Sequence, residues 1–398
     1  MSASNSDRNK RGNSLKRVLK YLMKLCEELG YISSYVTSYK VGKSGYSDHK
    51  QFKAAYKITF SDGNEWIAFT TTSLKDRIKE QYWDSLNIKE INPNVKQAFL
   101  VYPDSLNESD RHEFESKNKK IQNHGEYSTL DALVSQDSFF NRIEEYALKS
   151  YSPSKQREKK GNNFEKRIAA TLKNPCNLKK WKMNDSMLEG LHYSLFYDII
   201  SIFGLNPSHI ERIDSTSDKT KIGLLPSGGP AKTDVLTTVT YDNGTVETYT
   251  ISCKRSSNSE VSVHQYSADT FADILDPNNA ELRRVLNCFQ TYGNRKEMNS
   301  TDVIVLEQEI HPHIMKLCEW AIAGIGGEGD PETQWANYIL IYDNNNESYH
   351  INTTRDYCSL LANLPRRPHA GFNTPFTWSY QGTRGTNIQL SCRIKTTR

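Results

Sequence analysis

Three residues in one short stretch of this sequence have the types and the order that phosphodiester hydrolysis requires. Asp234 stands at the head of one alternating segment, and Ser252 and Lys254 lie at the end of the next. A carboxylate can hold a divalent metal ion that activates water, and a lysine can stabilise the charge that develops on the phosphate. Because Mg²⁺ prefers oxygen ligands, the main-chain carbonyl of Cys253 is a further candidate ligand. The stretch predicts a metal-dependent phosphodiesterase site.

Ser252 is the unusual member of this set. The common arrangement Asp…Asp/Glu-x-Lys has an acid at that position, and a hydroxyl is a poor replacement for it as a metal ligand. Glu165 lies in the first turn of a predicted helix, where compensation of the helix dipole is the ordinary reason for a glutamate. If that helix packs beside the Asp234 strand, Glu165 supplies a second carboxylate for the metal.

The turn at residues 242–244 decides whether these side chains can meet. Asp-Asn-Gly between two β-rich segments is a strong hairpin signal. A two-residue loop would place Asp234 opposite Cys253, facing away from Ser252 and Lys254, whereas one extra loop residue would place Asp234 opposite Lys254. An active site therefore requires an odd-numbered loop or a kink near Asp234.

The remaining C-terminal part alternates between helical and strand-like patterns. The predicted helices cover residues 163–172, 186–203, 268–275, 280–291 and 311–323, and the predicted strands cover 235–241, 245–254, 336–342 and 348–352.

The N-terminal part has the order helix, hairpin, helix, strand, helix, over residues 15–29, 55–70, 74–86, 97–102 and 138–148. A nuclease-like αββαβ core would show this order. The second strand ends in Phe69-Thr70-Thr71-Thr72, however, without an acid-x-lysine pair. We favour a small α/β module for contact with DNA or a partner, with a degenerate or an active nuclease-like domain as the alternatives.

Residues 151–162 contain Pro, Ser, Gly and a cluster of basic side chains, which is typical of a linker. They divide the chain into an N-terminal α/β domain, residues 1–150, and a larger domain, residues 163–398. The linker is interpreted as a solvated hinge, and its basic residues could also lie along a phosphate backbone.

The length of the chain is consistent with two domains, because 398 residues exceed the usual size of one domain. The net charge of +4 permits nucleic acid as a partner without requiring it. Seven scattered cysteines without a Cys-x-x-Cys indicate a reducing compartment. Neither a membrane span nor a secretory signal is recognisable, so the expected location is the cytoplasm.

Several segments that keep a fixed order resemble the MspI family of type II restriction endonucleases over about residues 162–398. They are residues 161–166 (GNNFEK), 228–234 (GGPAKTD), 252–257 (SCKRSS), 261–266 (VSVHQY), 371–374 (GFNT), 378–380 (WSY) and 388–390 (IQL). The resemblance implies a PD-(D/E)xK restriction-endonuclease-like α/β core, with a mixed central sheet flanked by helices. It also implies Mg²⁺-dependent, site-specific cleavage of double-stranded DNA, an activity with which a homodimer is compatible.

The resemblance also assigns roles to individual residues. Asp234, Ser252 and Lys254 match the catalytic strand positions, and Glu165 matches the helix glutamate; Asp234, Glu165 and Cys253 are the expected metal ligands. Ser262, Ser379 and Gln389 match positions implicated in base contact. Gln265 and, on chemical grounds, Arg384 and Arg393 are further expected DNA-contacting residues. Glutamine can read adenine and arginine can read guanine, although the two arginines could equally contact the backbone.

Two other functions fit the same residues. A site-specific DNA-binding protein with a decayed nuclease core would explain Ser252. A nuclease or binding protein that senses DNA structure or modification would use the N-terminal domain as its reader.

Overall fold

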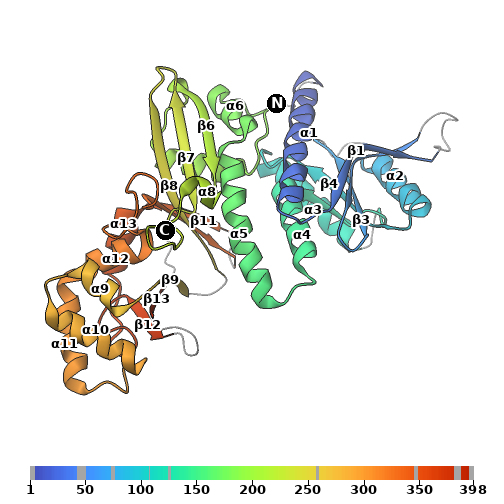
Figure 1. The fold of residues 1–398 in the computed structure, drawn as a ribbon. Coiled ribbons are helices and arrows are strands. Elements are labelled where there is room, and N and C mark those ends of the chain that lie inside the picture. The colour runs from blue at the N-terminus through green and yellow to red at the C-terminus, as the bar shows by residue number, and fades with distance from the viewer. Residues whose placement is uncertain are drawn as a thin grey trace. The chain divides into compact units, whose positions relative to one another are not determined.

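The structure is a computed structural model that describes residues 5–42, 51–72, 77–106, 108–123, 127–256, 260–344, 348–380 and 387–393 (Figure 1). The chain divides into two compact units. The first unit comprises residues 1–159 and 173–197, and the second comprises residues 160–172 and 198–398.

A mixed five-stranded sheet forms the centre of the first unit, in the order β1-β2-β3-β4-β5. β1, β2 and β3 form an antiparallel meander, whereas β4 runs parallel to β3, and β5 runs parallel to β4. The elements are α1 (Asn5–Glu28), β1 (Ser34–Val41), β2 (Phe52–Thr59), β3 (Glu65–Thr70), α2 (Arg77–Ile91), β4 (Val95–Tyr102), α3 (Glu108–Gln122), β5 (Ala132–Ser135), α4 (Gln136–Leu148) and α6 (Pro175–Met183). The helix, hairpin, helix and strand expected here are all present, and β1 and β5 extend the sheet at its two edges.

Helices cover both faces of this sheet. Apolar side chains of α2 and α3, including Ile88 and Phe114, pack with Ile67 and Leu100 on one face. α1 and α4 lie on the other, where the ring of Trp66 packs against aromatic neighbours. The unit therefore has its own buried core, as its predicted independence requires.

The expected linker at residues 151–162 is largely helical. α5 (Pro153–Leu172) begins inside it and runs without a break into the predicted helix at 163–172. The basic residues that suggested a hinge are also good helix formers, and Pro153 is tolerated in a first helical turn. The first boundary between the units falls within α5, between residues 159 and 160, and the chain crosses between the units again after residues 172 and 197.

The second unit has a mixed five-stranded sheet in the order β11-β10-β8-β7-β6. β6, β7 and β8 form an antiparallel meander, and β10 runs parallel to β8. Phe164 of α5 lies near the rings of Tyr342 on β10 and Tyr349 on β11. The elements are β6 (Ile210–Thr216), α8 (Lys219–Ile222), β7 (Val235–Tyr241), β8 (Val246–Ser256), β10 (Tyr338–Asp343), β11 (Ser348–Thr353) and α13 (Thr354–Ala362). The predicted helix at 186–203 is the shorter α7 (Tyr193–Ile202), which is divided between the two units after residue 197.

The loop between β7 and β8 has the odd length that an active site requires. Tyr241 pairs with Thr245 through a 2.9 Å hydrogen bond, which leaves residues 242–244 as the loop. Val235 pairs with Ile251, so Asp234 falls in register with Ser252. The prediction of an odd loop is confirmed, but the register is shifted by two residues from the expected pairing with Lys254. The same parity still directs all three side chains to one face.

A smaller antiparallel sheet, in the order β12-β13-β9, is backed by a helical cluster. Its buried face, with Trp378 and Leu390, joins a large apolar core that includes Phe271, Phe289 and Trp320 of the helices. The elements are β9 (Glu260–Tyr266), α9 (Ala268–Leu275), α10 (Ala280–Tyr292), α11 (Ser300–Ile310), α12 (Ile314–Ala323), β12 (Phe376–Tyr380) and β13 (Ile388–Arg393).

Among the described residues, no helix is long and apolar enough to cross a membrane.

The β7–β8 turn yields a test of this register. Gly244 has φ of +83°, a conformation that costs other residues about 1–2 kcal/mol. We expect Gly244→Ala to lower the free energy of unfolding by about that amount, measured by urea denaturation. Gly161→Ala, in the helical conformation of α5, is the matched control and should leave stability unchanged or raise it by about 0.5–1 kcal/mol. Equal effects of the two substitutions would contradict the assigned turn.

Candidate active site

The β7–β8 hairpin brings together the three residues that the sequence singled out. The Asp234 carboxylate accepts hydrogen bonds from the amide of Cys253 at 2.8 Å and from the hydroxyl of Ser252 at 3.3 Å. The ammonium of Lys254 lies 3.7 Å from the same oxygen. Ser252 is fully buried, so its hydroxyl serves the carboxylate and not the open surface.

Glu165 and Asp234 are linked by a lysine that sequence reasoning missed. The ammonium of Lys219 lies 3.2 Å from Asp234 Oδ1 and 3.4 Å from Glu165 Oε2. Lys219 begins the short helix α8, and the Asp218 side chain caps that helix. The cap was a recognisable sequence signal for a helix start, but nothing in the sequence indicated that α8 would reach the carboxylates.

The pKa shifts in this cluster follow from burial and close charges. Burial and the nearby charge of Asp234 raise the pKa of Glu165 to about 7, against the opposing effects of Lys219 and Lys254. Burial by itself would lower the pKa of Lys219, but Asp234 and Glu165 more than offset it and raise that pKa. Glu165 therefore lies close enough to Asp234 for their negative charges to interact.

The donor set fits a hard divalent cation. Two carboxylates already hold one positive charge, the Lys219 ammonium, between them. The Cys253 peptide lies beside Asp234, since its amide donates to that carboxylate. The Cys253 thiol is buried, and its pKa is raised well above the ordinary value by burial and then by Asp234, so it remains a neutral thiol. No cluster of three or more His, Cys, Asp or Glu suited to a metal occurs within the described ranges. Any metal would therefore depend on main-chain oxygens and water as well as on the two carboxylates.

Lys232 connects the β7–β8 hairpin to the small sheet. It precedes Asp234 by two residues, and its ammonium donates to the carbonyl of Val263 on β9 at 2.5 Å. Burial, followed by the repulsion of Lys254, lowers the pKa of Lys232 to about 7, against the attraction of Asp234. This contact ties the start of β7 to β9.

Three of the predicted DNA-contacting residues form one row across the small sheet. Ser379 pairs with Gln389, and Gln389 pairs with Gln265. Directly opposed residues point to the same face of a sheet. A bulge after Leu390 brings Ser262 close enough for its hydroxyl to accept a 2.6 Å hydrogen bond from the Gln389 amide.

The other two predicted DNA-contacting residues are arginines. Arg393 is exposed at the end of β13, in register with Glu260. Arg384 lies outside the described residues.

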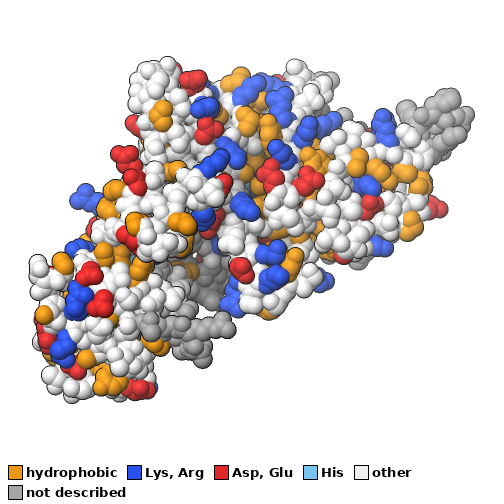
Figure 2. All heavy atoms as spheres, in the orientation of Figure 1, with side chains coloured by type: hydrophobic (Ala, Val, Ile, Leu, Met, Phe, Trp, Pro, Cys, Tyr) orange, Lys and Arg blue, Asp and Glu red, His pale blue; other side chains and the backbone are white. Residues whose placement is uncertain are grey.

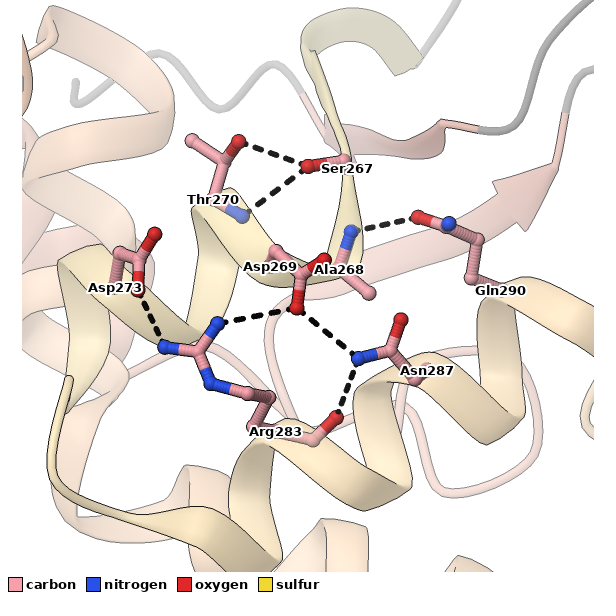
Figure 3. A network of polar contacts seen from close by, with 8 residues as sticks. All are labelled: Ser267, Ala268, Asp269, Thr270, Asp273, Arg283, Asn287 and Gln290. Atoms are coloured by element: carbon pink, nitrogen blue, oxygen red, sulfur yellow. Dashed lines mark hydrogen bonds and ion pairs between the residues drawn. The ribbon is translucent and has the colours of Figure 1, made fainter.

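The chain leaving β9 is anchored by a polar network between α9 and α10 (Figure 3). The hydroxyl of Ser267 caps α9 by accepting from the amide of Thr270, and the Ala268 amide donates to Gln290 at 2.6 Å. Arg283 of α10 forms ion pairs with Asp269 and Asp273 of α9. The network fixes the position at which β9 ends, next to the predicted DNA-contacting residues.

One cleft of about 650 Å³ joins the two groups of residues. Asp234, Lys232 and Lys254 line one part of it, and Ser262 and Gln265 line another. All of these residues belong to the second unit. A ligand in this cleft would contact the acidic and basic groups of the hairpin together with the polar face of the small sheet.

Comparison with known proteins identifies the family of this chain. A family described as "Restriction endonuclease MspI" matches residues 140–392. The type II restriction enzyme BsuFI of Bacillus subtilis is 23% identical over 98% of this chain and 98% of its own length. The type II restriction enzyme MspI of Moraxella sp is 22% identical, over 58% of this chain and 88% of its own.

A crystal structure of MspI in complex with its cognate DNA has the same fold over 64% of this chain and 98% of its own, with a TM-score of 0.53 and 18% identity. The family match covers the β7–β8 hairpin and the small sheet, whereas the alignment with BsuFI extends over nearly the whole chain. The chain thus belongs to the MspI family and is a type II restriction endonuclease, a site-specific deoxyribonuclease that acts on DNA.

Proposed function

We propose that the second unit is a PD-(D/E)xK core that cleaves double-stranded DNA with Mg²⁺, held by Asp234, Glu165 and the carbonyl of Cys253. The observation that carries this proposal is one cleft lined both by Asp234 and Lys254 of the hairpin and by Ser262 and Gln265 of the small sheet. Restriction endonucleases typically use a divalent metal ion. Mg²⁺ would activate a water molecule and neutralise charge on the scissile phosphate.

The protein side chains around the metal position have separate roles. Lys254 points to the same carboxylate and lines the cleft, so its ammonium can contact the phosphate and stabilise the developing charge. Ser252 is a positioning residue, because its buried hydroxyl donates to Asp234 and orients it. A serine therefore suffices where the common pattern has an acid, provided that Glu165 supplies the second carboxylate.

The polar face of the small sheet is the proposed reader of the DNA sequence. Ser379, Gln389 and Gln265 stand in one row, and Gln389 holds Ser262 in place. A glutamine side chain in the major groove can form two hydrogen bonds with one base, which distinguishes base pairs there. Arg393 is assigned to the DNA backbone, because it lies at the far end of β13 from this row.

Replacing Lys254 tests the catalytic assignment. We expect Lys254→Met to reduce the cleavage rate by about 10²–10³-fold or more, the usual effect of removing one preorganised charge donor. Binding to the target duplex, measured with Ca²⁺ in place of Mg²⁺, should change by less than about threefold. Lys221→Met, at an exposed position of α8, is the control and should cleave normally. Cleavage by Lys254→Met at the wild-type rate would exclude the assigned site.

Replacing Lys219 tests whether the two carboxylates bind the metal. Its ammonium lies between them and would compete with a divalent cation for the same oxygens. We expect Lys219→Met to bind Mn²⁺ about tenfold more tightly in calorimetric titration without DNA, since a competing charge is removed. Asp234→Asn should abolish that binding, and Lys221→Met should leave it unchanged. Weaker Mn²⁺ binding by Lys219→Met would mean that this lysine orients the carboxylates instead.

Replacing Gln389 tests the proposed reader. Gln389→Ala removes both its base contact and its hydrogen bond to Ser262. We expect the preference for the target over single-base variants to fall by about 1–3 kcal/mol at one base pair, with little change in non-specific binding. The control is Thr245→Ala, at the exposed end of the β7–β8 hairpin. An equal loss of affinity for all sequences would instead assign Gln389 to the backbone.

A further inference from the structure

The two units contain β-hairpins with the same turn. In the second unit Tyr241 pairs with Thr245 at 2.9 Å, and Gly244 has φ of +83°. In the first unit Phe60 pairs with Asn64 at 2.9 Å, and Gly63 has φ of +81°. In each turn the middle side chain, Asn243 or Asp62, accepts a 2.9 Å hydrogen bond from the amide two residues later.

The surrounding strand order is similar. Each hairpin is the second and third strand of an antiparallel meander, and each third strand lies beside a parallel fourth strand. The helices differ, because α1 precedes the first meander, whereas the shorter α7 precedes the second and α8 lies between β6 and β7. β2 and β7 alternate between buried and less buried residues in the same phase from the turn outward. The fifth strands differ, since β5 is parallel to its neighbour and β11 is antiparallel.

Corresponding positions of the two hairpins are found by counting the same number of residues outward from each turn. The position of Asp234 in the second unit corresponds to that of Lys53 in the first unit. The position of Ser252 likewise corresponds to that of Thr71, which is also buried and also bears a hydroxyl. The metal-binding carboxylate of one hairpin therefore corresponds to an ammonium group in the other.

Lys53 lines a groove of about 480 Å³ where β2 begins and β3 ends. Three more lysines line it, namely Lys16 and Lys20 of α1 and Lys40 of β1. All four are exposed, and none forms an ion pair with a carboxylate of the described residues. Figure 2 shows Lys and Arg side chains along α1.

Two acidic residues, Glu80 and Asp84, share the groove with the four lysines. Burial and then the charge of Glu80 raise the pKa of Asp84 to about 6, against the opposing effects of the Lys53 amide and the Lys53 ammonium group. The groove keeps an excess of positive charge even when both acids are ionised.

The lysines are placed where they repel one another. Lys40 and Lys53 are directly opposed across the β1–β2 ladder. Lys16 and Lys20 are one helical turn apart on α1. Like charges in either arrangement destabilise a free protein by a few tenths of a kcal/mol or more. Bound anions would relieve both repulsions, so the arrangement favours a polyanionic ligand.

We propose that the first unit is a second nuclease-like core in which lysine has replaced the metal-binding carboxylate, and that its basic groove binds the phosphate backbone of duplex DNA without a metal ion. DNA is the polyanion on which this enzyme acts. Lys and Arg outnumber Asp and Glu in the first unit, whereas acids are in slight excess in the second. The first unit thus supplies the positive charge that long-range attraction to DNA requires. The inference does not depend on the Mg²⁺ site, because no metal takes part in it.

The test uses the full chain, with the four groove lysines changed to alanine. Its binding to a random-sequence duplex is measured by fluorescence anisotropy in EDTA, over about 50–200 mM salt. At the lowest salt concentration, we expect the affinity for DNA to fall about tenfold or more. The magnitude of the slope of log affinity against log salt concentration should decrease by about 2–4, one unit for each lost phosphate contact. Cleavage of a saturating amount of target DNA should keep its rate, because the groove lies outside the catalytic cleft.

A control variant changes four exposed lysines of the same unit that do not line the groove, Lys96, Lys119, Lys120 and Lys149, to alanine. It removes the same charge, so general electrostatics would weaken both variants equally. Equal losses, or no loss in the groove variant, would overturn the proposal. A groove variant with four arginines should retain the affinity and the salt slope, and Glu80→Gln should strengthen binding. These two variants keep the test decisive if the alanine variant folds poorly.

Discussion

The site depends on how the Asp234 carboxylate is held. The Cys253 amide and the Ser252 hydroxyl donate to it, and the ammonium groups of Lys254 and Lys219 lie within ion-pair distance. A carboxylate in this setting is fixed in orientation before any ligand arrives, which is the condition for an effective metal site. Ser252, Cys253 and Lys254 are consecutive residues of β8. The strand register that aligns one of them with Asp234 therefore aligns all three.

The small sheet is positioned with equal precision relative to the β7–β8 hairpin. Its apolar face is packed into a large core, so its polar face is held rigidly toward the cleft. The Lys232 contact with Val263 connects the head of β7 directly to β9. In the proposed function, a connection of this kind would keep the distance between the cleaved phosphate and the bases that are read nearly constant. A type II enzyme needs that constancy in order to cut at a fixed position.

The two units show how one architecture can serve opposite electrostatic purposes. The meander and the turn are the same, but an aspartate stands at one strand head and a lysine at the other. Carboxylates that converge on a strand end attract cations, whereas ammonium groups that converge there attract phosphates directly. The fold determines where charge is concentrated, and the side chains determine which partner it suits.

Local patterns in the sequence were sufficient for much of this protein. Alternation and the Asp-Asn-Gly turn predicted both strands of the catalytic hairpin, and the odd loop was recognised as a requirement because side-chain direction has a period of two. The types and order of Asp234, Ser252 and Lys254 suggested phosphodiester hydrolysis. The segments shared with the MspI family predicted a type II restriction endonuclease that acts on DNA, which the comparisons confirm.

Other features were decided by contacts between distant segments. Lys219 belongs to a four-residue helix whose only local signal is its cap, so its approach to Glu165 and Asp234 could not be read from periodicity. The basic segment at 151–162 resembled a linker, but it is the start of α5, because tertiary packing of the following turns extends the helix backward. The correspondence of Lys53 with Asp234 required two strand registers to be compared. Sequence alone determined which chemical groups are present and which face each strand presents, while the tertiary structure decided which groups meet, since that depends on packing between residues far apart in the chain.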